Sequence, residues 1–250
     1  KYANPRVITY MFFDCHCHIS ELNIFEELLT FTENFYCNSL LTIADFDEAL
    51  PLKTKFKNLL FSFGLHPLYL KTEHFNKNWV IDNIKYIDAI GEIGLDTFSQ
   101  SNIEFQKKVF IEQLEFADCY NRPVIIHSRK TYYEIYKIFK TQKFQTNIAF
   151  HNFTGNIDIA EKLLEFDNVF FCYTSKFQNF NFSKKNAVNL MPIDKILFET
   201  DAPYISNYAI DDVSKNYEIF IKELAQITKL NSDCLKSKIF ENSKLFFKIN

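Results

Sequence analysis

The sequence predicts an α/β fold, and within that class a single closed (β/α)8 barrel, or TIM barrel. Eight short apolar runs alternate with longer amphipathic segments along 250 residues, and this alternation predicts parallel strands joined by helices. Apolar residues make up 47% of the chain, enough to bury the large core that such a barrel needs. Polar and charged residues follow six of the eight runs. A ring of such residues is typical of a barrel mouth, whereas an open doubly wound sheet would gather them at one switch point.

Each predicted strand is a short apolar run, and each predicted helix carries apolar residues at helical spacing. The predicted strands are Phe12–Cys15, Ser39–Ala44, Leu59–Gly64, Ala89–Ile93, Val124–His127, Ile148–His151, Val169–Tyr173 and Ile196–Glu199. The predicted helices are Glu21–Glu33, Phe46–Phe56, Asn78–Ile84, Ile103–Tyr120, Tyr132–Lys140, Asp158–Glu165, Tyr217–Thr228 and Asp233–Glu241. Ser232 is the expected cap of the last helix.

The chain is expected to form one domain over residues 11–250. Residues 1–10 precede Met11 and are interpreted as an upstream extension or a cloning remnant. None of the six cysteines forms a CxxC pair, so reduced, mostly buried thiols and a cytoplasmic location are expected. No apolar run approaches the length of a membrane span, and a monomer without membrane contact is the expectation.

Two histidines close the first predicted strand, in the segment Asp14-Cys15-His16-Cys17-His18. Residues two apart on a strand point to the same face, so His16 and His18 could reach one metal ion while the two cysteines turn outward. Asp14 shares the histidine face and could orient the imidazoles. An HxH pair is a weak signal by itself, because two structural histidines would show the same spacing.

Two carboxylates at the ends of predicted strands are the candidate catalytic residues: Glu92 lies near the end of Ala89–Ile93, and Asp201 comes just after Ile196–Glu199. The two oxygens of Glu92 could bridge two cations, although a buried salt bridge is the alternative. Asp201 could bind a metal and accept a proton from an attacking water. Glu199 lies two residues before it, either as a polar contact inside the barrel or as part of the site.

Three more histidines and an arginine also end strands. His127 and His151 each close an apolar run; a lone histidine there is usually structural, but their equivalent positions favour metal ligation. His66 precedes Pro67 and could contact a substrate phosphate, or be a loop histidine held by the rigid proline. Arg129 could bind a phosphate oxygen or form a salt bridge at a helix start.

Six segments together resemble the TatD family of metal-dependent hydrolases over roughly residues 12–204. They are DCHCH at 14–18, GLHP at 64–67, AIGEIGLD at 89–96, RPVIIHSR at 122–129, FHNFTGN at 150–156 and ILFETDAPY at 196–204. The resemblance implies a TIM barrel of the amidohydrolase type. It also implies a divalent-metal deoxyribonuclease, often a 3′→5′ exonuclease on single-stranded or damaged DNA.

The resemblance also implies roles for the candidate residues. His16, His18 and Asp201 look like ligands of a first metal, and Glu92 looks like the shared ligand. His127 and His151 look like ligands of the second metal. His66 corresponds to a histidine that faces substrate phosphate, and Asp201 would also orient or deprotonate water.

Two divalent ions (Mg, Mn or Zn) are the expected cofactors, and DNA is the expected partner. Because the net charge is -3, the contact with DNA is expected to be short and local. Family members commonly carry Arg and Asn in the stretch that follows the ETDAPY segment. In this chain that stretch has no basic residue between position 204 and Lys215. The loop Thr174-Ser175-Lys176-Phe177 lacks a glycine that is often present.

Two other functions are compatible with the same barrel. One is hydrolysis of an ester or amide, such as D-aminoacyl-tRNA; many related amidohydrolases use a carboxylated lysine on strand 4, where this chain has Glu92. The other is a non-catalytic binding protein that keeps the metals for structure, which the complete set of six ligands argues against.

Overall fold

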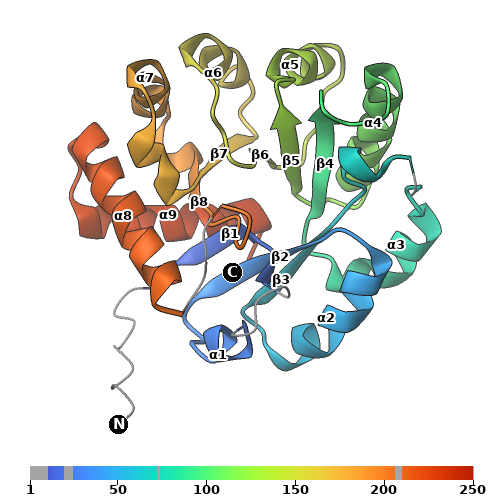
Figure 1. Ribbon diagram of the computed structural model, residues 1–250, viewed down its shortest axis with the longest axis horizontal. Coiled ribbons are helices and arrows are strands. Elements are labelled where there is room, and N and C mark those ends of the chain that lie inside the picture. Colours follow the sequence, from blue (N-terminus) through green and yellow to red (C-terminus); the bar gives the residue numbers. More distant parts are fainter. Residues whose placement is uncertain (1–10, 20–24, 72–73, 206–209, 250) are drawn as a thin grey trace.

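The computed structural model describes residues 11–19, 25–71, 74–205 and 210–249, and these form a barrel of eight parallel strands (Figure 1). The strands are β1 (Phe13–Cys17), β2 (Phe35–Leu40), β3 (Leu59–Phe63), β4 (Ile90–Asp96), β5 (Val124–Arg129), β6 (Ile148–Phe150), β7 (Val169–Tyr173) and β8 (Ile196–Phe198). The predicted fold class is therefore confirmed.

Helices surround the strands on the outside (Figure 1). They are α1 (Phe25–Leu29), α2 (Ile43–Lys55), α3 (Lys77–Asn83), α4 (Ile103–Cys119), α5 (Tyr132–Thr141), α6 (Ile157–Leu163), α7 (Phe182–Leu190), α8 (Ile210–Thr228) and α9 (Ser232–Phe247). Short 3-10 turns occur at Pro67–Tyr69, Ile84–Tyr86, Ser175–Asn179 and Ile193–Lys195. In the described residues, no helix has the length and apolar character needed to cross a bilayer.

The barrel is built from two sheets that meet at two seams. One sheet has the order β1-β2-β3 and the other the order β4-β5-β6-β7-β8. At the first seam, Ser62 of β3 pairs with Ala89, just before β4. At the second, the amide of Asp201 donates to the carbonyl of His16 at 2.9 Å, and the amide of His18 donates to the carbonyl of Ala202 at 2.7 Å. These two hydrogen bonds close the barrel between β1 and the end of β8, and each is made by the backbone of at least one candidate site residue.

Alternate residues of the strands fill the inside of the barrel, and α9 closes one end. A buried cluster unites small or apolar residues of seven strands, and Ala89 just before β4, with three rings of α9: Phe13, Cys15, Cys37, Leu60, Ala89, Ile125, Ala149, Phe170, Cys172, Leu197, Phe240, Phe246 and Phe247. The side-chain amide (Nδ2) of Asn147, just before β6, donates to the carbonyl of Phe246 at 3.1 Å. Because Asn147 precedes its strand, α9 covers the end of the barrel where the strands begin. The mouth, at the carboxyl ends of the strands, stays open.

The second strand was predicted in the wrong place. It was expected at Ser39–Ala44 but runs over Phe35–Leu40. The apolar run continues past the strand because Ile43 opens α2. Thr42 caps this helix: its hydroxyl accepts from the amide of Asp45, whose carboxylate accepts from the amide of Thr42.

Helix bounds differ as well: α8 begins at Ile210 rather than at Tyr217, and α9 ends at Phe247 rather than at Glu241. Two other details also differ. Helix α7 was not predicted, because its apolar pattern is weak: Phe182 is 82% exposed and only Ala187 and Val188 are buried. Asn231, rather than Ser232, caps α9 by accepting from the amides of Asp233 and Cys234.

The cysteines have free thiols, four buried and two exposed, as expected.

Cys15 does not turn toward the helices as predicted. It joins the cluster inside the barrel, and its thiol donates to Ser243 of α9 at 3.2 Å. Cys17 does pack in the layer between strands and helices. The alternation breaks because the pairing of β1 with β2 shifts between Asp14 and Cys17, and such a bulge re-aims the side chains around it.

Candidate metal centre

The bulge in β1 directs His16 and His18 to the open end of the barrel. Their rings lie 5.2 Å apart between centroids, and both side chains are buried. Asp14 does not orient the imidazoles. Its carboxylate accepts from the amide and the hydroxyl of Thr200 and weakly from the amide of His16, so it holds β1 against the end of β8.

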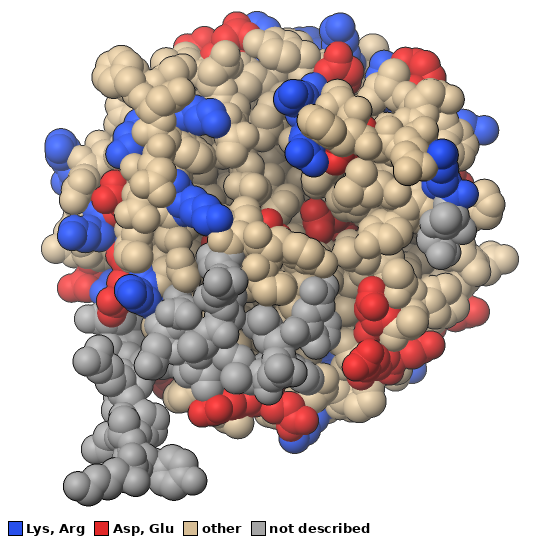
Figure 2. All heavy atoms as spheres, in the orientation of Figure 1, with Lys and Arg blue, Asp and Glu red and all other residues tan. Residues whose placement is uncertain are grey.

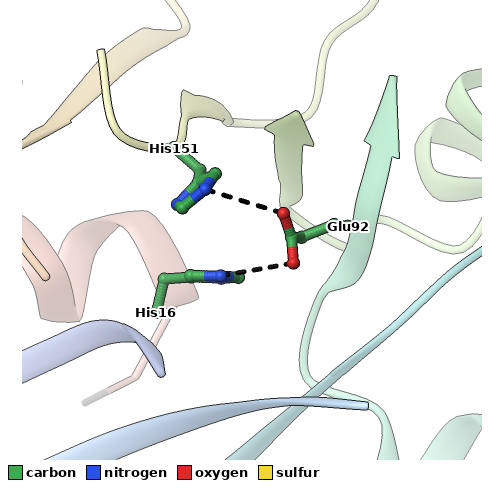
Figure 3. A group of neighbouring side chains, drawn as sticks. All are labelled: His16, Glu92 and His151. Carbon is green, nitrogen blue, oxygen red and sulfur yellow. Dashed lines mark ion pairs between the residues drawn. The ribbon is translucent and has the colours of Figure 1, made fainter. Parts of the chain in front are cut away.

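Glu92 lies at the centre of the cluster, and its two oxygens face different histidines. Its Oε1 is 3.4 Å from Nε2 of His16 and 3.5 Å from Nε2 of His18. Its Oε2 is 3.6 Å from Nδ1 of His127 and 3.6 Å from Nε2 of His151. Figure 3 shows His16 and His151 on separate oxygens of the same carboxylate.

Asp201 closes the cluster from the segment after β8. Its Oδ1 is 3.5 Å from Nε2 of His16 and 3.7 Å from Nε2 of His18, and its Oδ2 is 3.8 Å from Nε2 of His151. The backbone of Asp201 has a φ of 50°, a conformation that aspartate tolerates better than most residues. This turn brings the carboxylate back over the barrel mouth.

The spacing of these atoms fits shared cations. Around a tetrahedral ion with bonds of about 2.1 Å, neighbouring ligand atoms lie roughly 3.4 Å apart. Three triples of side chains have ligand atoms close enough to hold one ion: His16–Glu92–His151, His16–His18–Asp201 and His66–Glu92–His127. His16 is fully buried, and neither of its ring nitrogens has a hydrogen bond. A buried imidazole whose nitrogens make no hydrogen bond is costly, and a cation between Nε2 and the nearby carboxylates would remove part of that cost.

Two further carboxylates hold the outer nitrogens of His127 and His151. Asp96 Oδ2 accepts from Nε2 of His127 at 2.9 Å, and Glu199 Oε2 accepts from Nδ1 of His151 at 3.2 Å. Glu199 also accepts from the amide of Asn152 at 2.5 Å. A proton held on the outer nitrogen leaves the inner one free to bind a cation, which is the usual arrangement of metal-binding histidines.

Comparison with known proteins identifies the family. A family model described as TatD related DNase matches residues 13–248. The chain belongs to the TatD family.

Relatives and solved structures agree with this TatD assignment. An uncharacterized metal-dependent hydrolase of Methanocaldococcus jannaschii is 30% identical over 206 residues, covering 80% of each chain. Another, from Buchnera aphidicola, is 28% identical over 257 residues, covering 93% of this chain and 95% of the relative. The crystal structure of YJJV, a TatD homologue from Escherichia coli K12, shares the fold at a TM-score of 0.82 with 21% identity, covering 96% of this chain and 99% of that one. The predicted family and the predicted enzyme class, a metal-dependent hydrolase, are confirmed.

The charges in this TatD site are strongly coupled. Burial raises the pKa of Glu92, but the charges of His16 and His151 outweigh it and hold that pKa well below its usual range. Burial likewise opposes ionisation of Asp201, and the charge of His151 lowers its pKa overall. Both carboxylates are therefore ionised at neutral pH. They place two negative charges among the imidazoles, as a cation site requires.

His66 borders the cluster in a different state. Burial lowers the pKa of His66 to about 4, against the opposing charge of Glu92, so its imidazole is neutral at neutral pH. Its Nδ1 accepts from the amide of Leu68 at 3.2 Å, which puts the ring proton on Nε2, 3.9 Å from Glu92 Oε2. His66 thus presents an N–H donor to the mouth, which suits an anionic substrate oxygen better than a metal ion.

The structure brings together all six predicted ligands, with His66 beside them, but Arg129 lies outside the cluster. Its guanidinium carbon is 3.9 Å from the centre of the Phe98 ring. The sequence interpretation also missed the contact of Asp96 with His127 and the exposed ring of Tyr204, 4.7 Å from that of His18. A second carboxylate at the end of the buried strand β4 was the available signal for Asp96.

Proposed function

We propose that this TatD protein is a two-metal phosphodiesterase that removes nucleotides from the 3′ end of single-stranded or damaged DNA. The observation that carries the proposal is the division of the Glu92 oxygens, one toward His16 and His18 and the other toward His127 and His151. A carboxylate between two pairs of imidazoles is suited to bridge two cations. The family description as a DNase supports DNA as the substrate class.

The six cluster residues would hold the ions in two sets that share Glu92. His16, His18 and Asp201 would hold one ion (Mg, Mn or Zn), and His127 and His151 would hold the other. When bound, two divalent ions lower the pKa of water and stabilise the charge that develops on a phosphate in hydrolysis. Asp96 and Glu199 would hold the outer nitrogens of His127 and His151, so that Nδ1 of His127 and Nε2 of His151 face the ions.

Three side chains would act on water and substrate. Asp201, ionised and at the edge of the cluster, would orient the attacking water and accept its proton. His66 would donate Nε2–H to a phosphate oxygen. Arg129, on the rim, would pair with a phosphate of the strand farther from the reacting centre.

Cleavage of labelled DNA tests this function. Purified protein with Mg²⁺ or Mn²⁺ should shorten a 5′-labelled single-stranded oligonucleotide stepwise from its 3′ end, and a chelator should stop the reaction. His127→Ala and Asp201→Asn should each lower kcat by at least about a hundredfold, a loss typical of removing one electrostatic contribution to the transition state.

A matched control is His74→Ala, which removes an exposed histidine outside the cluster and should keep full activity. Full activity in both site variants would refute the assignment of these residues. Turnover of D-aminoacyl-tRNA with no cleavage of DNA would refute the proposed substrate and leave the metal centre in place.

A further inference from the structure

An exposed aromatic ring stands on the rim of the barrel mouth beside the metal centre. Phe98 follows β4 and is 55% exposed. The guanidinium carbon of Arg129 lies 3.9 Å from its centre and the amine of Lys130 lies 5.2 Å from it. Two cations at one half-exposed ring make a surface that attracts both the phosphates and the flat faces of nucleic acid bases.

The position of this ring is tied to the metal centre. The amide of Phe98 donates to Asp96 Oδ1 at 2.7 Å, and the other oxygen of Asp96 accepts from His127. The amide of Thr97 donates to the carbonyl of Arg129 at 3.3 Å, and the hydroxyl of Ser99 donates to the carbonyl of Pro67 at 2.7 Å. The turn that carries Phe98 is thus fastened to the end of β5 and to the turn after β3, and a base on the ring would be held at a fixed place relative to the reacting phosphate.

The surroundings leave room and favourable charge for a strand. A cavity of about 440 Å³ adjoins the turn, and its charged lining residues are Lys107, Lys130, Asp96 and Glu134. In Figure 2 a hollow opens at the barrel mouth, with acidic side chains inside it. Lys and Arg side chains stand near this hollow on the side of α5 and on the side of α7 and α8, whereas Asp and Glu gather on the side of α2 (Figure 2). An anionic strand is therefore favoured on the side of the mouth where Phe98 lies.

We propose, on the basis of the function proposed above, that Phe98, Arg129 and Lys130 form a stacking platform for a base of single-stranded DNA. The ring holds the base, and the two cations hold the adjoining phosphates. In a blunt duplex the 3′-terminal base is held by its pairing partner and by its stacked neighbour, so it cannot settle on the ring as a single base without the cost of unpairing. The platform therefore makes the enzyme prefer an unpaired 3′ end, and Phe98 is a specificity-determining residue rather than a catalytic one.

Binding of a fluorescent single-stranded oligonucleotide to protein carrying Asp201→Asn, which should cleave it at least about a hundredfold more slowly, tests the platform. Adding Phe98→Ala should raise Kd by about 5- to 100-fold, the range typical of losing one base–aromatic stack. Phe98→Leu should raise Kd similarly, because it keeps apolar bulk but has no ring face. Phe98→Trp should restore binding. The Kd for a blunt duplex should change less than twofold in all three.

Tyr120→Ala is the matched control. Tyr120 is an aromatic residue with 37% exposure at the end of α4, on the closed side of the barrel, and its removal should leave Kd unchanged. A Kd within twofold of the parent in Phe98→Ala, or tight binding in Phe98→Leu, would overturn the platform. If protein without substitutions cleaves single-stranded DNA, such a result rejects the platform alone; if it neither binds nor cleaves DNA, the proposed function fails with it.

Discussion

Among single residues, a carboxylate outside the cluster determines which ring nitrogen of His127 and of His151 faces the centre of the site. His127 offers Nδ1 to the centre because Asp96 holds Nε2, and His151 offers Nε2 because Glu199 holds Nδ1. The two rings use opposite nitrogens. Each outer carboxylate therefore acts on one ring only, and its effect can be measured separately.

Asp96→Asn and Glu199→Gln should each weaken metal binding by about 10- to 100-fold, the usual effect of removing a partner that orients a ligand. Competition with a chromophoric chelator would measure the affinity. Asp158→Asn is the matched control, because Asp158 is a surface carboxylate on α6 that contacts Tyr133 and Lys162. An affinity equal to that of the control in both site variants would show that these carboxylates do not orient the ligands.

At the scale of elements, irregular strand pairing places the site residues. The pairing of β1 with β2 shifts between Asp14 and Cys17, around His16, and the pairing of β4 with β5 shifts between Ile90 and Ile93, around Glu92. A regular strand would alternate its side chains strictly. The shifts break this alternation just before the barrel mouth. Apolar residues therefore fill the interior toward α9, and the candidate metal-binding side chains gather at the mouth.

Gly94 allows β4 and β5 to approach each other beside His127. Its φ is 149°, and a Cβ added there would lie 1.9 Å from the carbonyl oxygen of His127. Gly94→Ala should therefore push β5 away, lower the free energy of unfolding by more than about 2 kcal/mol, and weaken metal binding through His127. Urea unfolding and metal titration would measure the two effects. A variant with unchanged stability and affinity would show that the two strands separate without cost.

At the scale of the whole molecule, the two ends of the barrel have different tasks. The open end carries the charged cluster, while α9 seals the other end with aromatic rings. Phe246 is fully buried, 5.5 Å from the ring of Phe170 and 4.8 Å from that of Phe247. Stability and chemistry are thus placed at opposite ends, which is general for this barrel architecture.

Phe246→Ala should lower the free energy of unfolding by about 3–5 kcal/mol, because it removes a ring from a packed interior. The neighbouring Leu245 is 63% exposed, so Leu245→Ala should change stability by less than about 0.5 kcal/mol. Both variants should bind metal with parental affinity in the folded state. Chemical denaturation followed by circular dichroism would measure the difference, and equal stability of the two would contradict the sealing role of α9.

The residue types and their spacing along the chain were enough to predict the barrel and its cluster. Eight apolar runs, five of the six histidines at strand ends and the carboxylates Glu92 and Asp201 are all visible in the sequence, because strand–helix alternation is a local pattern and a parallel barrel brings its carboxyl strand ends together. The capping box at Thr42 was also local, although the longer apolar run hid it.

The relations between strands, in contrast, could not be read from the sequence and required the folded barrel. The inward turn of Cys15 depends on a bulge. The outer nitrogens of His127 and His151 meet carboxylates 31 and 48 residues away along the chain, and the Phe98 ring meets Arg129 only because β4 and β5 are neighbours. These features arise from contacts between distant segments, whose geometry is set by packing and pairing of the whole barrel rather than by any local pattern of residues.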